Sequence, residues 1–148
     1  MLAEGTRAPV WEDGRPMGVL RRVLYWQAAA WAAGSLPELV APRWFLERLF
    51  DQTPYPDHTY VRAAGAMGIG LAMFMVLVAH RIEEVWWWSW AFVVVDALLA
   101  TICVLSALFG PQAGAGTALW WLLGVANVGF GAALLVGMGL AGQERPPI

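Results

Sequence analysis

The sequence predicts an all-α membrane protein: a bundle of four transmembrane helices with a short amphipathic interfacial helix after the first span. Hydrophobic residues make up 59% of the 148-residue chain and charged residues only 14%, whereas about 25% of a soluble domain is charged. A soluble fold of this size leaves too much surface exposed to hide so many apolar side chains. The apolar residues are also gathered into four stretches, each near the roughly 20 residues that cross a bilayer.

The four predicted spans define a transmembrane domain over 23–141, preceded by a polar segment over 1–22 and followed by a tail over 142–148. The spans cover 23–41, 60–79, 86–109 and 117–141. The third is the clearest, with Asp96 as its only charged residue, and the fourth, which has no charged residue, is next. The first is the most polar, because it contains Gln27, Pro37 and Glu38.

A short amphipathic helix is predicted directly after the first span. Pro42 suits the first position of a helix, and Arg43 and Glu47 are spaced to pair at i and i+4. We expect this helix to lie on the outer membrane surface through its apolar side chains. Its interfacial residues are Trp44, Phe45, Leu49 and Phe50.

The arginines predict the orientation, because basic residues concentrate on the cytoplasmic side of a membrane protein. With four spans, both termini and the 80–85 turn share one side. That side holds Arg7, Arg15, Arg21, Arg22, Arg81 and Arg145, and the other holds Arg43, Arg48 and Arg62. We therefore expect a multi-pass protein of the bacterial cytoplasmic (inner) membrane, with both termini in the cytoplasm.

Small residues recur along the predicted spans at four-residue steps. Helices in lipid pack closely where small side chains let their backbones approach. The predicted packing seams are Ala64, Gly68 and Ala72 in the second span, and Gly129, Ala133 and Gly137 in the fourth. These seams are enough to assemble one four-helix bundle, and one of them is also available for a homo-oligomer.

Asp96 lies near the middle of the third span, on a face with Ser89 and Cys103 at seven-residue steps. A carboxylate in the membrane is costly and normally faces the bundle interior with a partner. Burial disfavours the charged form, so we expect Asp96 to be protonated and to donate to Asn127, the only Asn. This candidate intramembrane polar site has two readings: a proton-coupled or ligand-binding carboxylate, or an architectural hydrogen bond.

Several function classes are excluded or lack support. The net charge is −2 and there is no basic run, so we expect no nucleic-acid partner. All nine basic residues are Arg, which removes the lysine of phosphate loops and Schiff bases. Cys103 is the only cysteine. We identify no catalytic, cofactor-binding or metal-binding constellation and assign no cofactor.

The order of features resembles small bacterial four-helix membrane proteins that are DoxX-like in layout. The matching residues are Gly34, Leu36-Pro37, Ala41-Pro42, Phe45-Leu46 and Leu49-Phe50, followed by Arg62-Ala63-Ala64-Gly65-Ala66. The resemblance covers about 25–110 and implies a first span, a Pro-led amphipathic segment and a glycine-containing opening to the second span. Some DoxX-like proteins are quinone-linked oxidoreductase subunits, but no residue here is matched to a catalytic position.

The sequence therefore predicts a small polytopic membrane protein without catalysis of its own, an accessory or structural subunit of a membrane complex. Its expected partners are the lipid bilayer and either another protein or further copies of itself. Two alternatives stay open. One is a small proton-coupled transporter that uses Asp96, and the other is a redox-linked protein that binds quinone or another lipophile.

Overall fold

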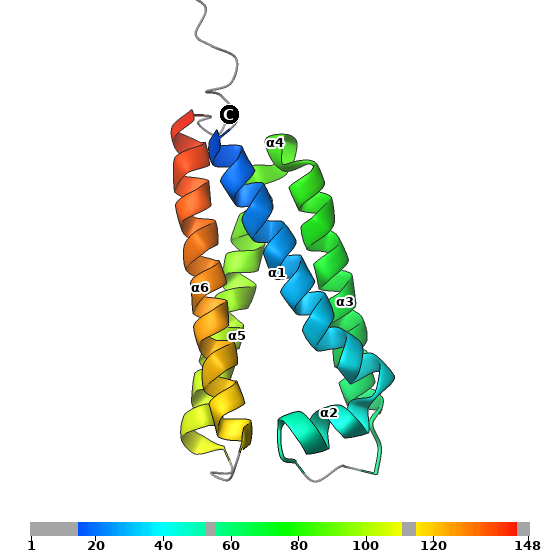
Figure 1. The fold of residues 1–148 in the computed structure, drawn as a ribbon. Coiled ribbons are helices and arrows are strands. Elements are labelled where there is room, and N and C mark those ends of the chain that lie inside the picture. The colour runs from blue at the N-terminus through cyan, green and yellow to red at the C-terminus, as the bar shows by residue number, and fades with distance from the viewer. Residues whose placement is uncertain (1–14, 53–55, 111–114, 145–148) are drawn as a thin grey trace, which may run out of the picture.

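Helices account for every regular element in the ranges that the computed structural model describes, residues 15–52, 56–110 and 115–144 (Figure 1). The elements are α1 (Arg15–Val40), α2 (Pro42–Leu49), α3 (Thr59–His80), α4 (Ile82–Val85), the 3₁₀ helix η1 (Trp86–Trp88), α5 (Ser89–Phe109) and α6 (Ala115–Glu144). This confirms the all-α class and the helix expected directly after the first span.

Within the described ranges, three helical stretches are long and apolar enough to cross a membrane: Thr59–His80, Ile82–Phe109 and Gly116–Gly142. They carry large apolar side chains on their outer faces; Leu122 and Val125, for example, are 64% and 68% exposed. Apolar side chains are stable in such positions when lipid covers them. The chain is therefore a helical membrane protein. Residues 23–40 of the predicted first span are continuous helix within α1, and this helix is not among the three stretches.

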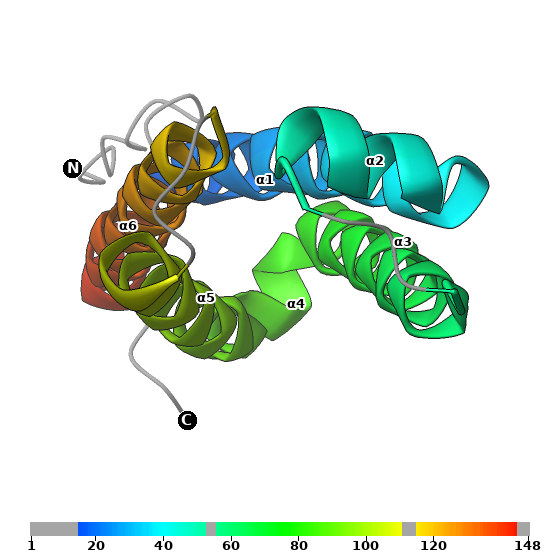
Figure 2. The same ribbon diagram turned by 90° about the horizontal axis from the view of Figure 1, so that it is seen from below.

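Helix α1 is the central element of the arrangement. It packs against α3 on one side and α6 on the other, and α5 packs against α6. Viewed from below, the long helices follow one another around a ring in the order α3, α1, α6, α5, and α4 bridges from α3 toward α5 (Figure 2). The start of α1, the α3–α4 junction and the end of α6 lie at one end of the molecule (Figure 1).

The buried core is concentrated at the α4 end. Its fully buried side chains include Leu20 and Leu24 of α1, Met75 of α3, Phe92 of α5 and Leu134 of α6. The first half of α1 thus meets the second half of α3 and of α6. The α1 helix also extends further back than the predicted start at 23, because the side chains one and two turns earlier find apolar partners in this core.

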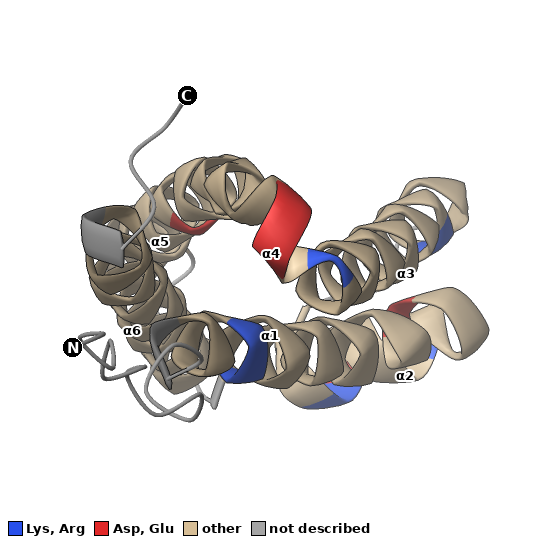
Figure 3. Cartoon of the chain, turned by 90° about the horizontal axis from the view of Figure 1, so that it is seen from above, with Lys and Arg blue, Asp and Glu red and all other residues tan. Residues whose placement is uncertain are grey.

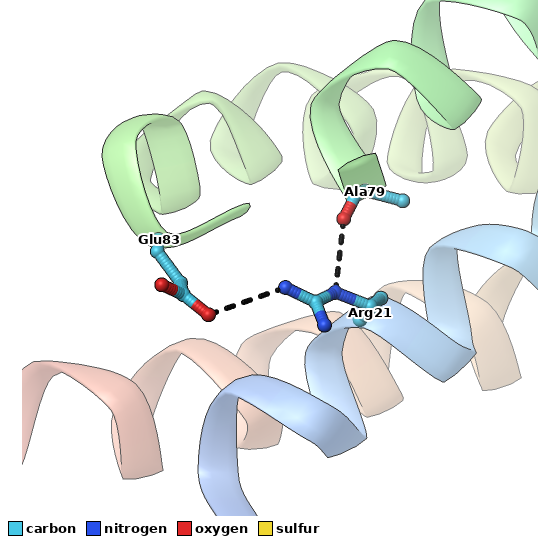
Figure 4. A network of polar contacts seen from close by, with 3 residues as sticks. All are labelled: Arg21, Ala79 and Glu83. Carbon is cyan, nitrogen blue, oxygen red and sulfur yellow. Dashed lines mark hydrogen bonds and ion pairs between the residues drawn. The ribbon is translucent and has the colours of Figure 1, made fainter. Parts of the chain in front are cut away.

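A polar contact ties α1 to the junction of α3 and α4. The Nε atom of Arg21 donates to the carbonyl oxygen of Ala79 at 3.1 Å, and Nη2 lies 3.4 Å from Oε1 of Glu83 (Figure 4). The last carbonyl groups of a helix lack partners within the helix, so a guanidinium there is favourable. From above, acidic residues of α4 lie across from basic residues of α1 (Figure 3).

Helices α1 and α3 approach closely where α3 is made of small residues. A Cβ atom added to Gly65 would lie 2.8 Å from the carbonyl oxygen of Ser35, and one added to Gly68 would collide with the Ser35 side chain. Ala72, further along this face, is 5% exposed. The prediction for Ala64 is wrong: it is exposed and lines a cavity, because the close approach falls one position later.

The α6 seam also differs from the prediction at one position. A Cβ atom added to Gly137 would lie 3.1 Å from the side chain of Leu20, and Ala133 is partly buried. Gly129 is exposed, and a Cβ atom there would meet nothing within 4 Å. Its place in the seam is wrong because it lies about 200° around the helix from Gly131, and Gly131 and Gly124 are the glycines that face α5.

Helix α2 lies across the end opposite α4 (Figure 1). Pro42 occupies its first turn, as predicted, and Nε of Arg43 donates to Oε1 of Glu47 at 2.8 Å, which confirms the expected i, i+4 pair. The helix ends at Leu49 with Phe50 as its C-cap, and the next residue, Asp51, has a positive φ of 52°. Aspartate tolerates this left-handed conformation better than most residues.

Candidate functional site

A buried polar pair joins α1 to α5. The Nε2 atom of Gln27 donates to Oδ1 of Asp96 at 2.7 Å, and the two residues are 0% and 1% exposed. Gln27 Oε1 and Asp96 Oδ2 are also buried, and neither has a hydrogen-bond partner among the described residues. Asp96 therefore faces the bundle interior, as predicted, together with Ser89 and Cys103, which are 0% and 4% exposed.

The predicted partner of Asp96 is wrong. Asn127 donates from Nδ2 to the carbonyl oxygen of Leu123, four residues earlier in its own helix, at 2.8 Å. Opposite Asp96, α6 instead presents Gly131, whose added Cβ would lie 3.4 Å from Asp96 Cβ. Gln27 was not predicted as a partner of Asp96. Its lone amide in an apolar stretch is the sequence signal that indicates a buried hydrogen-bond partner.

A cavity of about 680 Å³ opens between the α1–α3 pair and the α5–α6 pair, on the side of the polar pair toward α2. From α1 to α3 it is lined by Ala30, Trp31, Gly34, Ser35, Glu38, Phe45, Leu46, Leu49, Phe50, Gln52, Ala64, Met67, Gly68 and Leu71. From α5 and α6 it is lined by Leu99, Cys103, Leu119, Trp120, Leu123, Ala126, Asn127 and Phe130. Its volume and apolar lining are those of a site for a small lipophilic molecule.

The cavity ends close to the buried pair. Trp31 follows Gln27 by one helical turn in α1, and Leu99 follows Asp96 by about one turn in α5. One turn corresponds to about 5 Å along a helix. Three layers thus follow one another along the bundle. Apolar side chains fill the α4 end, the Gln27–Asp96 hydrogen bond lies next, and the cavity extends from there toward α2.

Most of the predicted interfacial residues of α2 contribute to this cavity. Phe45, Leu49 and Phe50 line it, whereas Trp44 does not and is 51% exposed. The ring of Phe50 lies 5.0 Å from that of Phe45 and 4.8 Å from that of Trp120, measured between centroids. The apolar face of α2 therefore packs toward the cavity and α6, and Trp44 is the one predicted interfacial residue outside the cavity lining.

Two further features bear on the chemistry of the chain. Within the described ranges, no group of three or more His, Cys, Asp or Glu residues is placed to hold a metal ion. A second hollow, between α1 and α3, is lined almost wholly by apolar side chains, including Tyr25, Ile69 and Met73, and ends at His80. Neither Gln27 nor Asp96 belongs to its lining.

Comparisons with known proteins identify no family for this chain. No family model, curated protein or solved structure matches the chain, so its function is inferred from the residues and contacts described above.

Proposed function

We propose that this protein is a membrane-embedded binding protein that holds a lipophile in the cavity between its two helix pairs and has no catalysis of its own. The observation that carries the proposal is the cavity itself. It is a partly open cavity bordered by four long helices and α2, it measures about 680 Å³, and aromatic and aliphatic side chains make up most of its lining. Such cavities bind ligands mainly by burying apolar surface.

In this proposal, helix α1 crosses the membrane as a fourth span. Helix α1 is 26 residues long and runs beside α3 and α6, which are both apolar enough to cross a membrane. Its polar residues Gln27 and Ser35 are buried against other helices, so they do not face lipid. In this arrangement both termini lie on one side of a bacterial inner membrane, and α2 lies at the opposite surface.

Asp96 has an architectural role in this proposal. Its carboxylate contacts Gln27 and packs over Gly131, and it does not belong to the cavity lining. A transporter that couples protons through Asp96 would need this group to meet the substrate path or water. The geometry therefore favours a hydrogen bond that fixes α1 against α5 over a proton-coupling carboxylate.

We also propose that the protein works as an accessory subunit, in keeping with the DoxX-like layout, by holding the lipophile beside a larger membrane complex or a further copy of itself. Purification in mild detergent tests this role. A subunit is expected to retain a stoichiometric protein partner or to form a defined homo-oligomer. Recovery of a monomer with no protein partner would contradict the subunit role while leaving the cavity proposal intact.

Photolabelling tests the cavity directly. The probe is a neutral hexadecanol that carries a diazirine in its chain, added to the purified protein in phosphatidylcholine nanodiscs. We expect saturable labelling of cavity residues such as Leu49 and Leu123. Labelling of lipid-facing residues such as Val94 and Leu98 should instead rise in proportion to the probe concentration, because bulk lipid offers no discrete site.

Two substitutions in α6 give a matched comparison. Ala126 lines the cavity, whereas Ala132 is exposed on the same helix and does not. Ala126→Phe should fill the cavity and remove the saturable labelling, and Ala132→Phe should leave it unchanged. Labelling of Leu123 that never saturates in the natural sequence would disprove the cavity as a binding site.

A further inference from the structure

Among the described residues that line the cavity, one has a formal charge. This residue is Glu38, near the end of α1, and the described lining includes no Arg, Lys or His. Its Cβ atom lies 2.9 Å from where a Cβ at Gly65 would stand, so the side chain starts at the close crossing of α1 and α3. Among the described residues, no hydrogen bond or ion pair to its carboxylate is formed.

Aromatic rings supply the second observation. The ring of Phe50 contacts those of Phe45 and Trp120, and the three rings line the α2 end of the cavity, which is also the end where Glu38 lies. The face of an aromatic ring attracts cations, most strongly where water is excluded. The arrangement therefore combines a carboxylate that lacks a basic partner with rings that favour the same sign of ligand charge.

We propose that the lipophile bound in this cavity is cationic: an amphiphile with an ammonium group at Glu38 and an apolar chain that extends toward the Gln27–Asp96 pair. The inference rests on the proposed binding function and names its ligand class. Glu38 lies at the α2 end of the cavity, and the deeper lining is apolar apart from Ser35, Cys103 and Asn127. An anionic lipophile would meet the carboxylate with no basic side chain to compensate its charge.

The experiment uses three photoprobes with the same diazirine-bearing hexadecyl chain and different head groups: trimethylammonium, hydroxyl and sulfate. Each is titrated into the protein in phosphatidylcholine nanodiscs, whose lipids carry no net charge. We expect the ammonium probe to saturate the labelling of cavity residues at a concentration about tenfold below that of the hydroxyl probe, because a carboxylate and an ammonium attract strongly at low dielectric. The sulfate probe should give no saturable labelling.

Substitutions test whether Glu38 is the origin of the preference. Glu38→Gln keeps the size of the side chain and should make the ammonium and hydroxyl probes saturate at equal concentrations. Saturable labelling by the hydroxyl probe then shows that the variant is folded. Glu38→Asp should retain part of the preference. The matched control is Glu47→Gln, because Glu47 is paired with Arg43 in α2 and does not line the cavity.

The outcomes separate the two proposals. If the ammonium and hydroxyl probes saturate equally in the natural sequence, or Glu38→Gln keeps the preference, the cationic assignment is overturned and the cavity remains a lipophile site. If none of the three probes labels the cavity saturably, both the cationic assignment and the proposed binding function fail.

Discussion

The amide of Gln27 and the carboxylate of Asp96 are joined by a 2.7 Å hydrogen bond between Nε2 and Oδ1, across 69 positions of sequence. This contact crosses the interior between α1 and α5, at the level where apolar packing gives way to the cavity. Each side chain keeps one buried oxygen that accepts no hydrogen bond among the described residues. The stability of the bundle should therefore depend on the presence of both polar side chains.

Substitutions at Asp96 should separate loss of the hydrogen bond from loss of the carboxylate. Asp96→Asn keeps the size and supplies an N–H donor, so we expect a free energy of unfolding close to that of the natural sequence. Asp96→Leu leaves the buried amide of Gln27 without a partner and should destabilise by about 1–3 kcal/mol. Unfolding of purified protein in mixed micelles by increasing denaturing detergent measures both.

A double variant provides the control for this pair. Gln27→Leu combined with Asp96→Leu removes both polar groups, so it should be more stable than Asp96→Leu alone, because no buried amide is left unpaired. A loss in the double variant equal to the sum of the losses in the Gln27→Leu and Asp96→Leu single variants would show that the two residues do not interact energetically.

The sequence predicted helix type and position well because the signals are local. Apolar stretches, Pro42 at a helix start and the spacing of Arg43 and Glu47 depend on residues within one or two turns. The inward face of α5 was predictable for the same reason, since Asp96 and Cys103 recur at a seven-residue interval on one side. These features require no knowledge of how the helices meet.

The contacts between helices were predicted less well because they depend on rotation and spacing that no single helix encodes. Asn127 and Gln27 are both lone amides within apolar stretches, and only the packing of α1 brings Gln27 rather than Asn127 to Asp96. The cavity was not predicted either. It lies between two helix pairs. Helices α1 and α3 are in close contact at Gly65, and α5 and α6 form a second pair that is separated from them toward α2 (Figure 1).

Two glycines of α3 should respond oppositely to alanine. A Cβ at Gly65 would lie 2.8 Å from the α1 backbone, whereas a Cβ at Gly70 would meet nothing within 4 Å. We expect Gly65→Ala to destabilise by about 1–3 kcal/mol through overpacking. Gly70→Ala should be neutral or stabilising by up to about 1 kcal/mol, because alanine favours helix. Detergent-induced unfolding compares them, and equal stabilities would place Gly65 away from the interface.

The polar contact at the α4 end should depend on Arg21 more than on Glu83. Arg21 reaches the carbonyl oxygen of Ala79 as well as Glu83, whose side chain is 62% exposed. Glu83→Gln should therefore change the free energy of unfolding by less than about 1 kcal/mol, as for other exposed ion pairs. Arg21→Met should cost more, because it also removes the donor to Ala79. The reverse order of stabilities would contradict this assignment.

Asp57, just before the start of α3, should make a pH-dependent contribution to the stability of the protein. Its Oδ1 accepts from Oγ1 of Thr59 at 2.6 Å and from the Thr59 backbone N–H at 2.8 Å, and these bonds lower the pKa of Asp57 below its ordinary value of 3.8. A lowered folded-state pKa means that the stabilisation is present above pH 3.8 and is lost as the pH falls through the folded value.

We therefore expect Asp57→Asn to lower the melting temperature slightly at pH 7, with the difference from the natural sequence shrinking below pH 3.8. Thermal unfolding in detergent, followed by circular dichroism at several pH values, measures this difference. Asp51→Asn is the matched control, because that carboxylate forms no hydrogen bond with Thr59. A difference that grows as the pH falls would show that the carboxylate does not stabilise this turn.

Cysteine labelling should place the two ends of the bundle on opposite sides of the membrane. Pro56, in the connection before α3, is exposed, and the side chain of Glu84 in α4 is 72% exposed. In a Cys103→Ser background, Pro56→Cys should react with an impermeant thiol reagent added to intact bacterial cells. Glu84→Cys should react only after the membrane is opened, because the arginines favour a cytoplasmic location for that end. The reverse pattern would invert the orientation, and labelling of both positions in intact cells would contradict a single four-span topology.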